Sequence, residues 1–339
     1  MRRTLTLAVA GLLALPPSSG VAREGVLEIN QTCAAGPGCF PGDSAGFPVQ
    51  ITGAAGRNYR LTSDVTVATA NSTGIEISGS TPGFVIDLGG FSLRGPGTCS
   101  GAPPVCALLG TGVGIGRAVG STAAAITVRN GTIAGFGSVG VNLQGTDECV
   151  IENLTVRENG STGVLVATGA RVSGVAAILN LSVGIETGFG SLIESSTARE
   201  NGGKGIGGGE GGVTVESASL SNRAEGIDPV GSGSVLARNQ SRLNGFDGLQ
   251  GALGTLFIEN TASANGQVAV SAGIIGGSGS RMHGNVVREN LGAGLDFTGD
   301  AAYSDNTITD NTVEAVGPAT GARGGNHCAG PGVGVATCP

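Results

Sequence analysis

The chain has 339 residues and a formal net charge of −7; 40% of its residues are hydrophobic, 13% are charged, and tryptophan is absent. Aromatic residues make up only 3%, which excludes a compact core built on large rings, and the acidity argues against binding nucleic acid or anionic lipid by bulk electrostatics. Its 65 glycines would suggest disorder if apolar residues were scarce. Because aliphatic residues are frequent and regularly placed, the composition favours a narrow tube filled with Val, Ile, Leu and Ala.

Residues 1–22 have the layout of a secretory signal peptide. Arg2 and Arg3 precede an apolar run at 5–15, which gives way to prolines and small residues ending at Ala22. The run is too short to span a bilayer, so we expect cleavage after Ala22 and a secreted or periplasmic bacterial protein, with a buried first strand as the alternative. Loss of two arginines takes the formal charge from −7 to −9.

The remaining chain divides into three predicted parts. Residues 23–58 are expected to form an N-terminal cap, because an open end of stacked strands must be covered to prevent edge-to-edge association. Residues 59–316 carry the repeated pattern, which an excursion at 95–114 interrupts. Residues 317–339 form a Gly-rich segment that we interpret as a C-terminal cap or tail.

Seven cysteines fit an oxidising compartment. Three pairs that lie close in the sequence are the predicted disulfides: Cys33 with Cys39, Cys99 with Cys106, and Cys328 with Cys338. This pairing rests on proximity alone, since a sequence does not determine connectivity. Cys149 is left as a lone thiol. A catalytic role for it would need a positioned histidine, and the two candidates, His283 and His327, are far along the chain.

A ladder of asparagines recurs with a period near 21 residues. The ladder consists of Asn159, Asn180, Asn201, Asn222, Asn244, Asn265, Asn290 and Asn311. Four residues later come small residues, Gly163, Gly184, Gly205, Gly226, Gly248, Ala269, Gly294 and Ala315. Directly after these come aliphatic ones, Val164, Ile185, Ile206, Ile227, Leu249, Val270, Leu295 and Val316. A fixed period of this length indicates that one structural unit recurs and stacks.

The repeats predict an all-β, single-domain, right-handed parallel β-helix with coils of about 21 residues. Apolar and polar residues alternate over three to five positions before Gly, Asn or Ser, which is typical of short strands and turns. Leucines are too few for leucine-rich repeats, and the six-residue period of left-handed β-helices is missing. We expect the aliphatic column to point inward and the Asn column to occupy a left-handed turn with amides bonded from coil to coil. The Gly column should supply positive φ or close packing.

Several motifs resemble those of a known group. The run 86–91 (Ile-Asp-Leu-Gly-Gly-Phe), the turn at 130–132 and the Asn-Gly-x-x-Gly-Ile rungs resemble right-handed parallel β-helix repeat-containing proteins of the pectate-lyase-like superfamily. The segment 28–43 resembles a bacterial secreted subgroup whose members mostly lack an assigned activity. The resemblance covers nearly the whole mature chain and implies the fold, but not the chemistry, because this fold carries lyases, hydrolases, epimerases, binding proteins and adhesins.

Candidate catalytic residues are Arg199, Glu186 and Asp228. The two acids occupy an outward position two residues after the small residue and lie two coils apart, so their backbones should be roughly 10 Å apart. That separation is near the wide end for the carboxylate pair of an inverting glycosidase. The alternative is that these are solvated positions with weak ion pairs. The resemblance supplies no recognisable catalytic set, and Lys204 is the only lysine.

A metal site is suggested only by Asp296, Asp300 and Asp305 on the last coils, as ligands for calcium. Solvated loops are the alternative, and no other cofactor is indicated. The sequence favours a non-catalytic secreted or periplasmic module that contacts a surface, a matrix or a glycan. The alternative is a polysaccharide lyase or glycoside hydrolase acting on an acidic polysaccharide. The expected partner is thus a polysaccharide or cell-surface glycan, with neither nucleic acid nor a membrane span.

Overall fold

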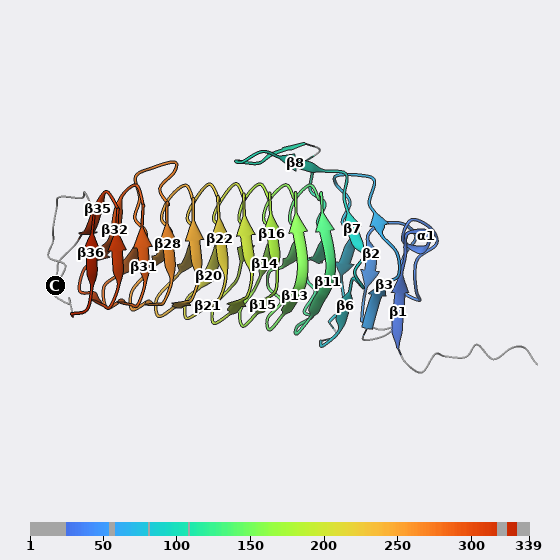
Figure 1. Cartoon of the computed structure of the whole chain (residues 1–339). Coiled ribbons are helices and arrows are strands. Elements are labelled where there is room, and N and C mark those ends of the chain that lie inside the picture. Colours follow the sequence, from blue (N-terminus) through green and yellow to red (C-terminus); the bar gives the residue numbers. More distant parts are fainter. Residues whose placement is uncertain (1–24, 54–57, 81, 108, 317–323, 331–339) are drawn as a thin grey trace, which may run out of the picture.

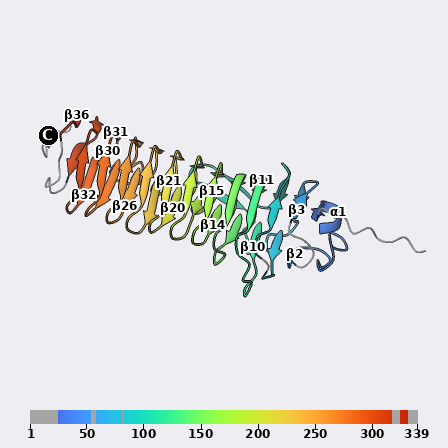
Figure 2. The ribbon, with the colours of Figure 1, turned by 90° about the horizontal axis from the view of Figure 1, so that it is seen from below.

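Parallel strands stack into a solenoid that runs the length of the molecule (Figure 1). The computed structural model describes residues 25–53, 58–80, 82–107, 109–316 and 324–330. A 12-stranded sheet and a 22-stranded sheet form its walls, and the all-β architecture agrees with the prediction. The predicted signal peptide lies outside the described residues. Figure 2 shows the same stack from below, with the short helix α1 (Gln31–Ala34) at the N-terminal end.

The 12-stranded sheet takes one strand from each coil. Its strands are β2 (Val49–Ile51), β5 (Ile75–Ile77), β10 (Ile115–Arg117), β12 (Val141–Leu143), β14 (Val164–Val166), β17 (Ile185–Glu186), β20 (Ile206–Gly209), β23 (Ile227–Val230), β26 (Leu249–Gly251), β29 (Ile274–Gly277), β32 (Ala293–Thr298) and β35 (Val313–Val316). All neighbours pair in parallel, so equivalent residues of successive coils lie side by side. This alignment makes the outer surface of the sheet a set of residue columns.

The 22-stranded sheet is bent into two faces. The first face contains β1 (Val26–Ile29), β3 (Asn58–Leu61), β6 (Val85–Asp87), β15 (Arg171–Ser173), β18 (Leu192–Glu194), β21 (Val213–Val215), β24 (Val235–Ala237), β27 (Leu256–Ile258), β30 (Arg281–His283) and β33 (Ala302–Ser304). The second face contains β4 (Val65–Thr66), β7 (Ser92–Arg94), β16 (Ala176–Ile178), β19 (Thr197–Arg199), β22 (Ala218–Leu220), β25 (Gln240–Arg242), β28 (Thr261–Ser263), β31 (Val286–Arg288), β34 (Thr307–Thr309) and β36 (His327–Ala329). Two longer strands, β11 (Thr127–Ala134) and β13 (Val150–Arg157), run through both faces. A regular coil therefore has three strands.

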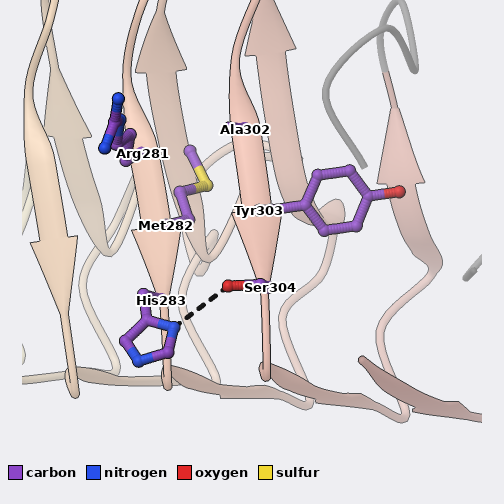
Figure 3. Close-up of a pocket in the computed structure, with 6 residues that line it drawn as sticks. All are labelled: Arg281, Met282, His283, Ala302, Tyr303 and Ser304. Carbon is purple, nitrogen blue, oxygen red and sulfur yellow. Dashed lines mark hydrogen bonds between the residues drawn. The ribbon is translucent and has the colours of Figure 1, made fainter. Parts of the chain in front are cut away.

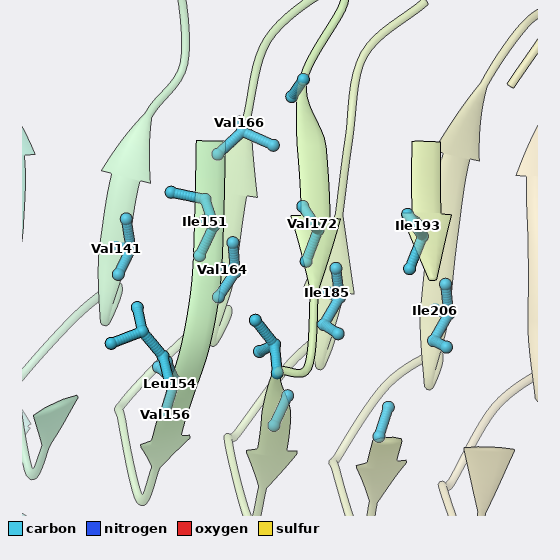
Figure 4. Close-up of a cluster of buried hydrophobic side chains, with 14 of the residues drawn as sticks. Val141, Ile151, Leu154, Val156, Val164, Val166, Val172, Ile185, Ile193 and Ile206 are labelled. Atoms are coloured by element: carbon cyan, nitrogen blue, oxygen red, sulfur yellow. The ribbon is translucent and has the colours of Figure 1, made fainter. Parts of the chain in front are cut away.

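Aliphatic side chains fill the interior as predicted. Figure 4 shows the column Val164, Ile185 and Ile206 of the 12-stranded sheet beside Val172 and Ile193 of the first face, and all five are buried. Because each side chain stacks on its equivalent one coil away, the core is a continuous narrow tube.

The predicted position of Val270 in this column is wrong. Val270 is 79% exposed, and Ile274 occupies the column instead, paired with Leu249 on one side and Leu295 on the other. The turn after Asn265 is four residues longer than its neighbours, which shifts the strand beyond it. One coil later, Ala315 pairs with Leu295, so the predicted place of Val316 is also off by one residue.

The asparagine ladder lies inside the solenoid wall and links the coils. The Nδ2 of Asn159 donates to Oδ1 of Asn180 at 2.9 Å, and Nδ2 of Asn180 donates to Oδ1 of Asn201 at 3.0 Å. The expectation that the asparagine itself is left-handed is wrong. The preceding residue takes that conformation, for example Glu158 with φ 56° and Leu179 with φ 54°. The asparagine side chain then satisfies the backbone that this bend leaves unpaired.

The glycine column serves close packing and has no positive φ. A Cβ on Gly184 would lie 2.6 Å from the carbonyl oxygen of Gly205 and 2.7 Å from Nδ2 of Asn201. The backbone of each coil therefore touches the ladder of the next, and only glycine leaves the room. Of the two roles expected for this column, the structure assigns close packing.

A second ladder, which the sequence analysis missed, lies at the bend between the two faces of the 22-stranded sheet. It consists of Asn239, Asn260, Asn285, Asn306 and Asn326, and Nδ2 of Asn239 donates to Oδ1 of Asn260 at 3.1 Å. In earlier coils Ser196 and Ser217 occupy this position. Because the ladder changes residue type midway, no single-residue repeat marks it along the whole chain.

The predicted excursion is an antiparallel hairpin, β8 (Thr98–Ser100) and β9 (Val105–Ala107), that projects from the solenoid in Figure 1. Its disulfide, Cys99–Cys106, is confirmed. So is the disulfide Cys33–Cys39 beside α1. Within 23–58, β1 and β2 already pair with the solenoid strands β3 and β5.

The remaining cysteines are only partly accounted for. Cys328 is disulfide-bonded, and its predicted partner Cys338 lies outside the described residues. Cys149 is buried and free, and burial raises the pKa of its thiol to about 11, so it is not a reactive nucleophile. Among the described helices, none is long and apolar enough to cross a membrane.

Candidate functional site

Glu186 and Asp228 lie on the outer surface of the 12-stranded sheet. The register pairs Glu186 with Gly207 and Gly207 with Asp228, so the two acids are two coils apart, the separation that the sequence spacing predicts. Arg199 is elsewhere: it ends β19 on the second face of the other sheet and pairs with Glu200 at 3.0 Å. The structure therefore keeps the two carboxylates near each other and separates them from the arginine.

Lys204 joins the carboxylates from the turn that precedes β20. Its Nζ forms an ion pair and hydrogen bond with Oδ2 of Asp228, whose side chain is only 10% exposed. Burial alone would lower the pKa of Lys204, but Asp228, with the charges of Glu225 and Glu186, raises it above its ordinary value. The ammonium is therefore held in its charged form, as a fixed cation rather than a base.

Asp247 lies one coil beyond Asp228, at the same turn position as Lys204. Burial raises its pKa to about 6. The hydrogen bond that its Oδ1 accepts from the Ala272 backbone N–H at 2.7 Å lowers the pKa, but by less than burial raises it. The negative charges of Glu225, Asp296 and Asp228 raise the pKa further. A carboxyl group that titrates near neutral pH is a common feature of catalytic and binding sites.

We call Glu186, Lys204, Glu225, Asp228 and Asp247 the Lys204 cluster. Between its two strand acids β20 places Gly207, which is itself buried and pairs with Glu186 on one side and Asp228 on the other. Gly208 pairs with the buried Pro229 and, one strand position later, faces the opposite way. A Cβ on Gly207 would meet nothing closer than Cγ of Glu186 at 3.6 Å, and Gly207 has no positive φ. The backbone thus does not require this glycine, and its effect is a shallow gap between the two acids, which we call the strip.

An exposed aromatic ring lies in the turn after the strand that carries Glu186. Phe189 follows Glu186 by three residues, in the turn that leads to β18, and is 60% exposed. Carboxylates and an ammonium therefore line the sheet surface, and the exposed ring lies in the turn that connects this sheet to the first face of the other one. This combination of a few polar groups with an apolar platform suits a ligand that has both hydroxyl groups and C–H faces.

The three predicted calcium ligands do not form one site. Asp296 lies in β32 of the 12-stranded sheet, and Asp300 lies in the turn after it. Asp305 is in the bend between β33 and β34, where its Oδ2 is 3.2 Å from Nδ1 of His283. Across the described ranges, no group of three or more His, Cys, Asp or Glu residues is arranged to hold a metal ion.

A shallow pocket of about 260 Å³ between β30 and β33 also brings together polar side chains (Figure 3). Nδ1 of His283 is 3.0 Å from Oγ of Ser304 and 3.2 Å from Oδ2 of Asp305. Both contacts involve the same ring nitrogen. A relay from an acid through histidine to a serine needs one partner on each nitrogen, so this group is not a nucleophilic triad.

Comparison with known proteins establishes the fold. Residues 181–333 match the family model described as "Right handed beta helix region". The solenoid is a right-handed parallel β-helix. The A-module of mannuronan C-5 epimerase AlgE6 from Azotobacter vinelandii superposes on the β-helix with a TM-score of 0.66 at 16% identity, covering 90% of each chain.

Two other solved structures are similar to the β-helix. The AlgE4 A-module from the same organism has a TM-score of 0.62 at 15% identity and covers 90% of this chain and 88% of that chain. A double mutant of the periplasmic alginate epimerase AlgG has a TM-score of 0.56 at 12% identity, covering 81% and 75%. No curated protein matches the chain. Identities this low show a shared fold alone.

Sequence reasoning missed Glu225 and Asp247 and gave Lys204 no role. A signal was present, because each of the three directly precedes a glycine of the small-residue column, in successive coils. The acids in the strands and these turn residues are far apart in sequence. They meet because stacking aligns equivalent positions.

Proposed function

We propose that the protein is an exported β-helix that binds a polysaccharide through the Lys204 cluster and the strip between its two strand acids. The observation that carries this proposal is Gly207, which the backbone does not require and which leaves a gap on the sheet surface between Glu186 and Asp228. A polymer chain lying on this strip would offer hydroxyl groups to the carboxylates and a C–H face to Phe189. The structurally similar epimerases, whose names refer to alginate and mannuronan, support a saccharide ligand in general.

The charge of the site favours a neutral chain. Five carboxylates, Glu186, Glu225, Asp228, Asp247 and Asp296, share this region with one ammonium group. That ammonium is already paired with Asp228. A uronate polymer would bring further negative charge against uncompensated carboxylates, which costs free energy at short range. We therefore replace the acidic polysaccharide of the sequence-based alternative with an uncharged one.

Glycoside hydrolysis is the second candidate, and Asp247 favours it. With a pKa of about 6 it is partly protonated near neutral pH, as a general acid must be, and Asp228 or Glu186 would serve as the second carboxylate. A lyase is less well supported, because the base must be unprotonated and Lys204 is held as a cation. Arg199, on another face, has no part in either scheme.

Size-exclusion chromatography with neutral and acidic polysaccharides tests both candidates. We expect co-elution with at least one neutral polymer, and loss of co-elution in Lys204→Met and in Gly207→Val, which fills the strip. Gln240→Val, on the second face of the other sheet, is the matched control and should bind normally. Shortened polymer that depends on Asp247 would support the hydrolase, and binding that survives both cluster variants would reject this site.

Export through cleavage after Ala22 is part of the proposal. Two disulfides in the described chain support an oxidising compartment. N-terminal sequencing of the protein recovered from periplasm or medium should begin at Arg23. A mature protein that retains Arg2 and Arg3 would reject this route.

A further inference from the structure

A group of aliphatic side chains faces outward on the first face of the 22-stranded sheet. The residues are Leu192, Val213, Val215, Val235, Ala237, Leu256 and Ile258, from β18, β21, β24 and β27. Ala237 is buried by its neighbours, and the other six are half-buried. The residues between them in each strand point inward and are buried, as are Leu236 and Phe257. The strand register aligns these side chains into two columns that form one continuous surface, which we call the aliphatic patch.

Charged residues limit the patch at both ends. At one end, Glu194 of β18 pairs with Arg171, one coil before the patch. One coil after the patch, β30 carries Arg281 and His283. The second face is polar beside the patch, where β25 exposes Gln240 and Arg242. The change from polar to aliphatic is therefore local to these coils. Outward strand positions need no aliphatic residue for the core, so the patch calls for another explanation.

The adjoining turn extends the apolar surface. Val230, at the end of β23, is 64% exposed, and Leu253, in the turn before β27, is 58% exposed. Both residues directly precede patch strands in the chain. Large exposed aliphatic residues next to a flat apolar sheet are typical of an association surface.

We propose that the aliphatic patch binds a second copy of this chain, in an antiparallel face-to-face arrangement. Two flat sheets with matching columns of aliphatic side chains can pack at about 10 Å, as the layers of a β-sandwich do. The charges fit this orientation. The guanidinium of Arg281 pairs with no carboxylate among the described residues. An antiparallel partner would bring its Glu194, whose Oε1 already pairs with Arg171, towards this guanidinium, so that one carboxylate would lie between two arginines.

The size of the patch sets the strength of the association. Four coils by the width of one strand and its turn cover about 20 Å by 15 Å, so two copies would bury roughly 600 Å². This is below the roughly 1,200 Å² at which stable interfaces begin, so we expect a weak dimer that depends on concentration. The Lys204 cluster is on a different sheet, which leaves it free to bind its ligand in the dimer.

Sedimentation velocity of the mature protein from about 5 µM to 500 µM tests the proposal. The wild type should shift from monomer towards dimer across this range, consistent with a weak interface. Val235→Lys should raise the dissociation constant at least tenfold, because it buries an ammonium at the centre of the patch. Val213→Lys is a second variant of the same kind, and Gln240→Lys, on the same coil as Val235, should dimerise like the wild type.

Other results would overturn the proposal. The patch is rejected as the interface if the wild type stays monomeric throughout. It is also rejected if Val235→Lys and Val213→Lys leave the dimer intact while Gln240→Lys disrupts it. Arg281→Glu should weaken the dimer, and a dimer that it strengthens rejects the antiparallel arrangement. A wild type that is monomeric at every concentration, combined with loss of polysaccharide binding in Val235→Lys, would assign the patch to the glycan. Circular dichroism and the melting temperature of each variant establish that it is folded.

Discussion

Single buried asparagines hold the coils of this β-helix together. The side-chain Oδ1 of each ladder asparagine accepts hydrogen bonds from the backbone N–H and the Nδ2 of the preceding ladder asparagine. Its own backbone N–H and Nδ2 donate to the Oδ1 of the next one. All these groups are buried, so none can exchange a lost partner for water. The ladder thus supplies acceptors for backbone N–H groups that the turn would otherwise leave unpaired.

Asn201→Ala should destabilise the protein by about 2 to 4 kcal/mol, since it removes the acceptor of two buried donors. Asn201 accepts from the backbone N–H and the Nδ2 of Asn180 at 3.0 Å each. Asn142→Ala is the control, because Asn142 is half-buried and outward-facing on β12, and should cost less than about 1 kcal/mol. Chemical denaturation followed by circular dichroism measures both. Equal losses of stability would show that the ladder bonds contribute little.

Asp247 should give the protein a pH-dependent stability. Its folded-state pKa of about 6 lies above its ordinary value of 3.8. At a pH between these two values, the folded chain therefore keeps a proton that the unfolded chain has released. Stability therefore falls as the pH rises from about 4 to 6. Asp247→Asn should melt close to the wild type at pH 4 and above it at pH 8. The exposed Glu210→Gln is the control, and parallel wild-type and Asp247→Asn curves would contradict the shift.

At the scale of the element, the hairpin of β8 and β9 differs from the rest of the fold. It pairs only with itself, whereas the coils are bonded to neighbours on both sides. Its tip reaches towards later coils, because Ala102 and Pro103 line a groove of about 190 Å³ with Arg223, Leu243 and Val268. A two-stranded hairpin is marginally stable alone, so the disulfide within it has a clear physical role.

Replacing Cys99 and Cys106 together by serine should loosen the hairpin and leave the β-helix folded. We expect limited proteolysis to cut within 98–107 at least tenfold faster than in the wild type, while circular dichroism stays unchanged. Serine at Cys33 and Cys39 is the comparison, since that disulfide lies beside α1 and should not affect cleavage of the hairpin. A hairpin that remains protected without its disulfide would show that its contacts with the coils suffice.

On the scale of the whole molecule, charge and length act together. The chain carries a formal charge of −7, which the proposed cleavage after Ala22 would take to −9 by removing two arginines. The stacked coils align several of its acids on one sheet. A long regular surface suits a long polymer, and a negative one selects against polyanions.

This charge predicts how salt affects the proposed binding of a polysaccharide. Binding of a neutral polymer should change less than twofold between about 20 mM and 300 mM salt, because no net charge is neutralised. An acidic polymer should be excluded at low salt, with any retention appearing only when screening is high. Size-exclusion at the two salt concentrations measures this. An acidic polymer that binds best at low salt would contradict the negative site and point to a cationic surface.

Much of the architecture could be predicted from the chain, because a solenoid repeats the same local chemistry. The spacing of Asn159, Asn180 and Asn201 indicated the coil, and the aliphatic column indicated its interior. Where a turn length changed, the prediction failed: the longer turn after Asn265 put Ile274 in the place assigned to Val270. The second ladder was missed because serine replaces asparagine in its first coils.

The sequence by itself determined the right-handed β-helix and the two-coil separation of Glu186 and Asp228, since both follow from the period of the chain. Proximity suggested the hairpin disulfide, which the structure confirmed. Only the tertiary structure decided that Lys204 pairs with Asp228, that Asp247 titrates near pH 6 and that Arg199 faces away. The physical reason is that charge and burial at a site depend on side chains from neighbouring coils, and on which wall of the solenoid each of them occupies.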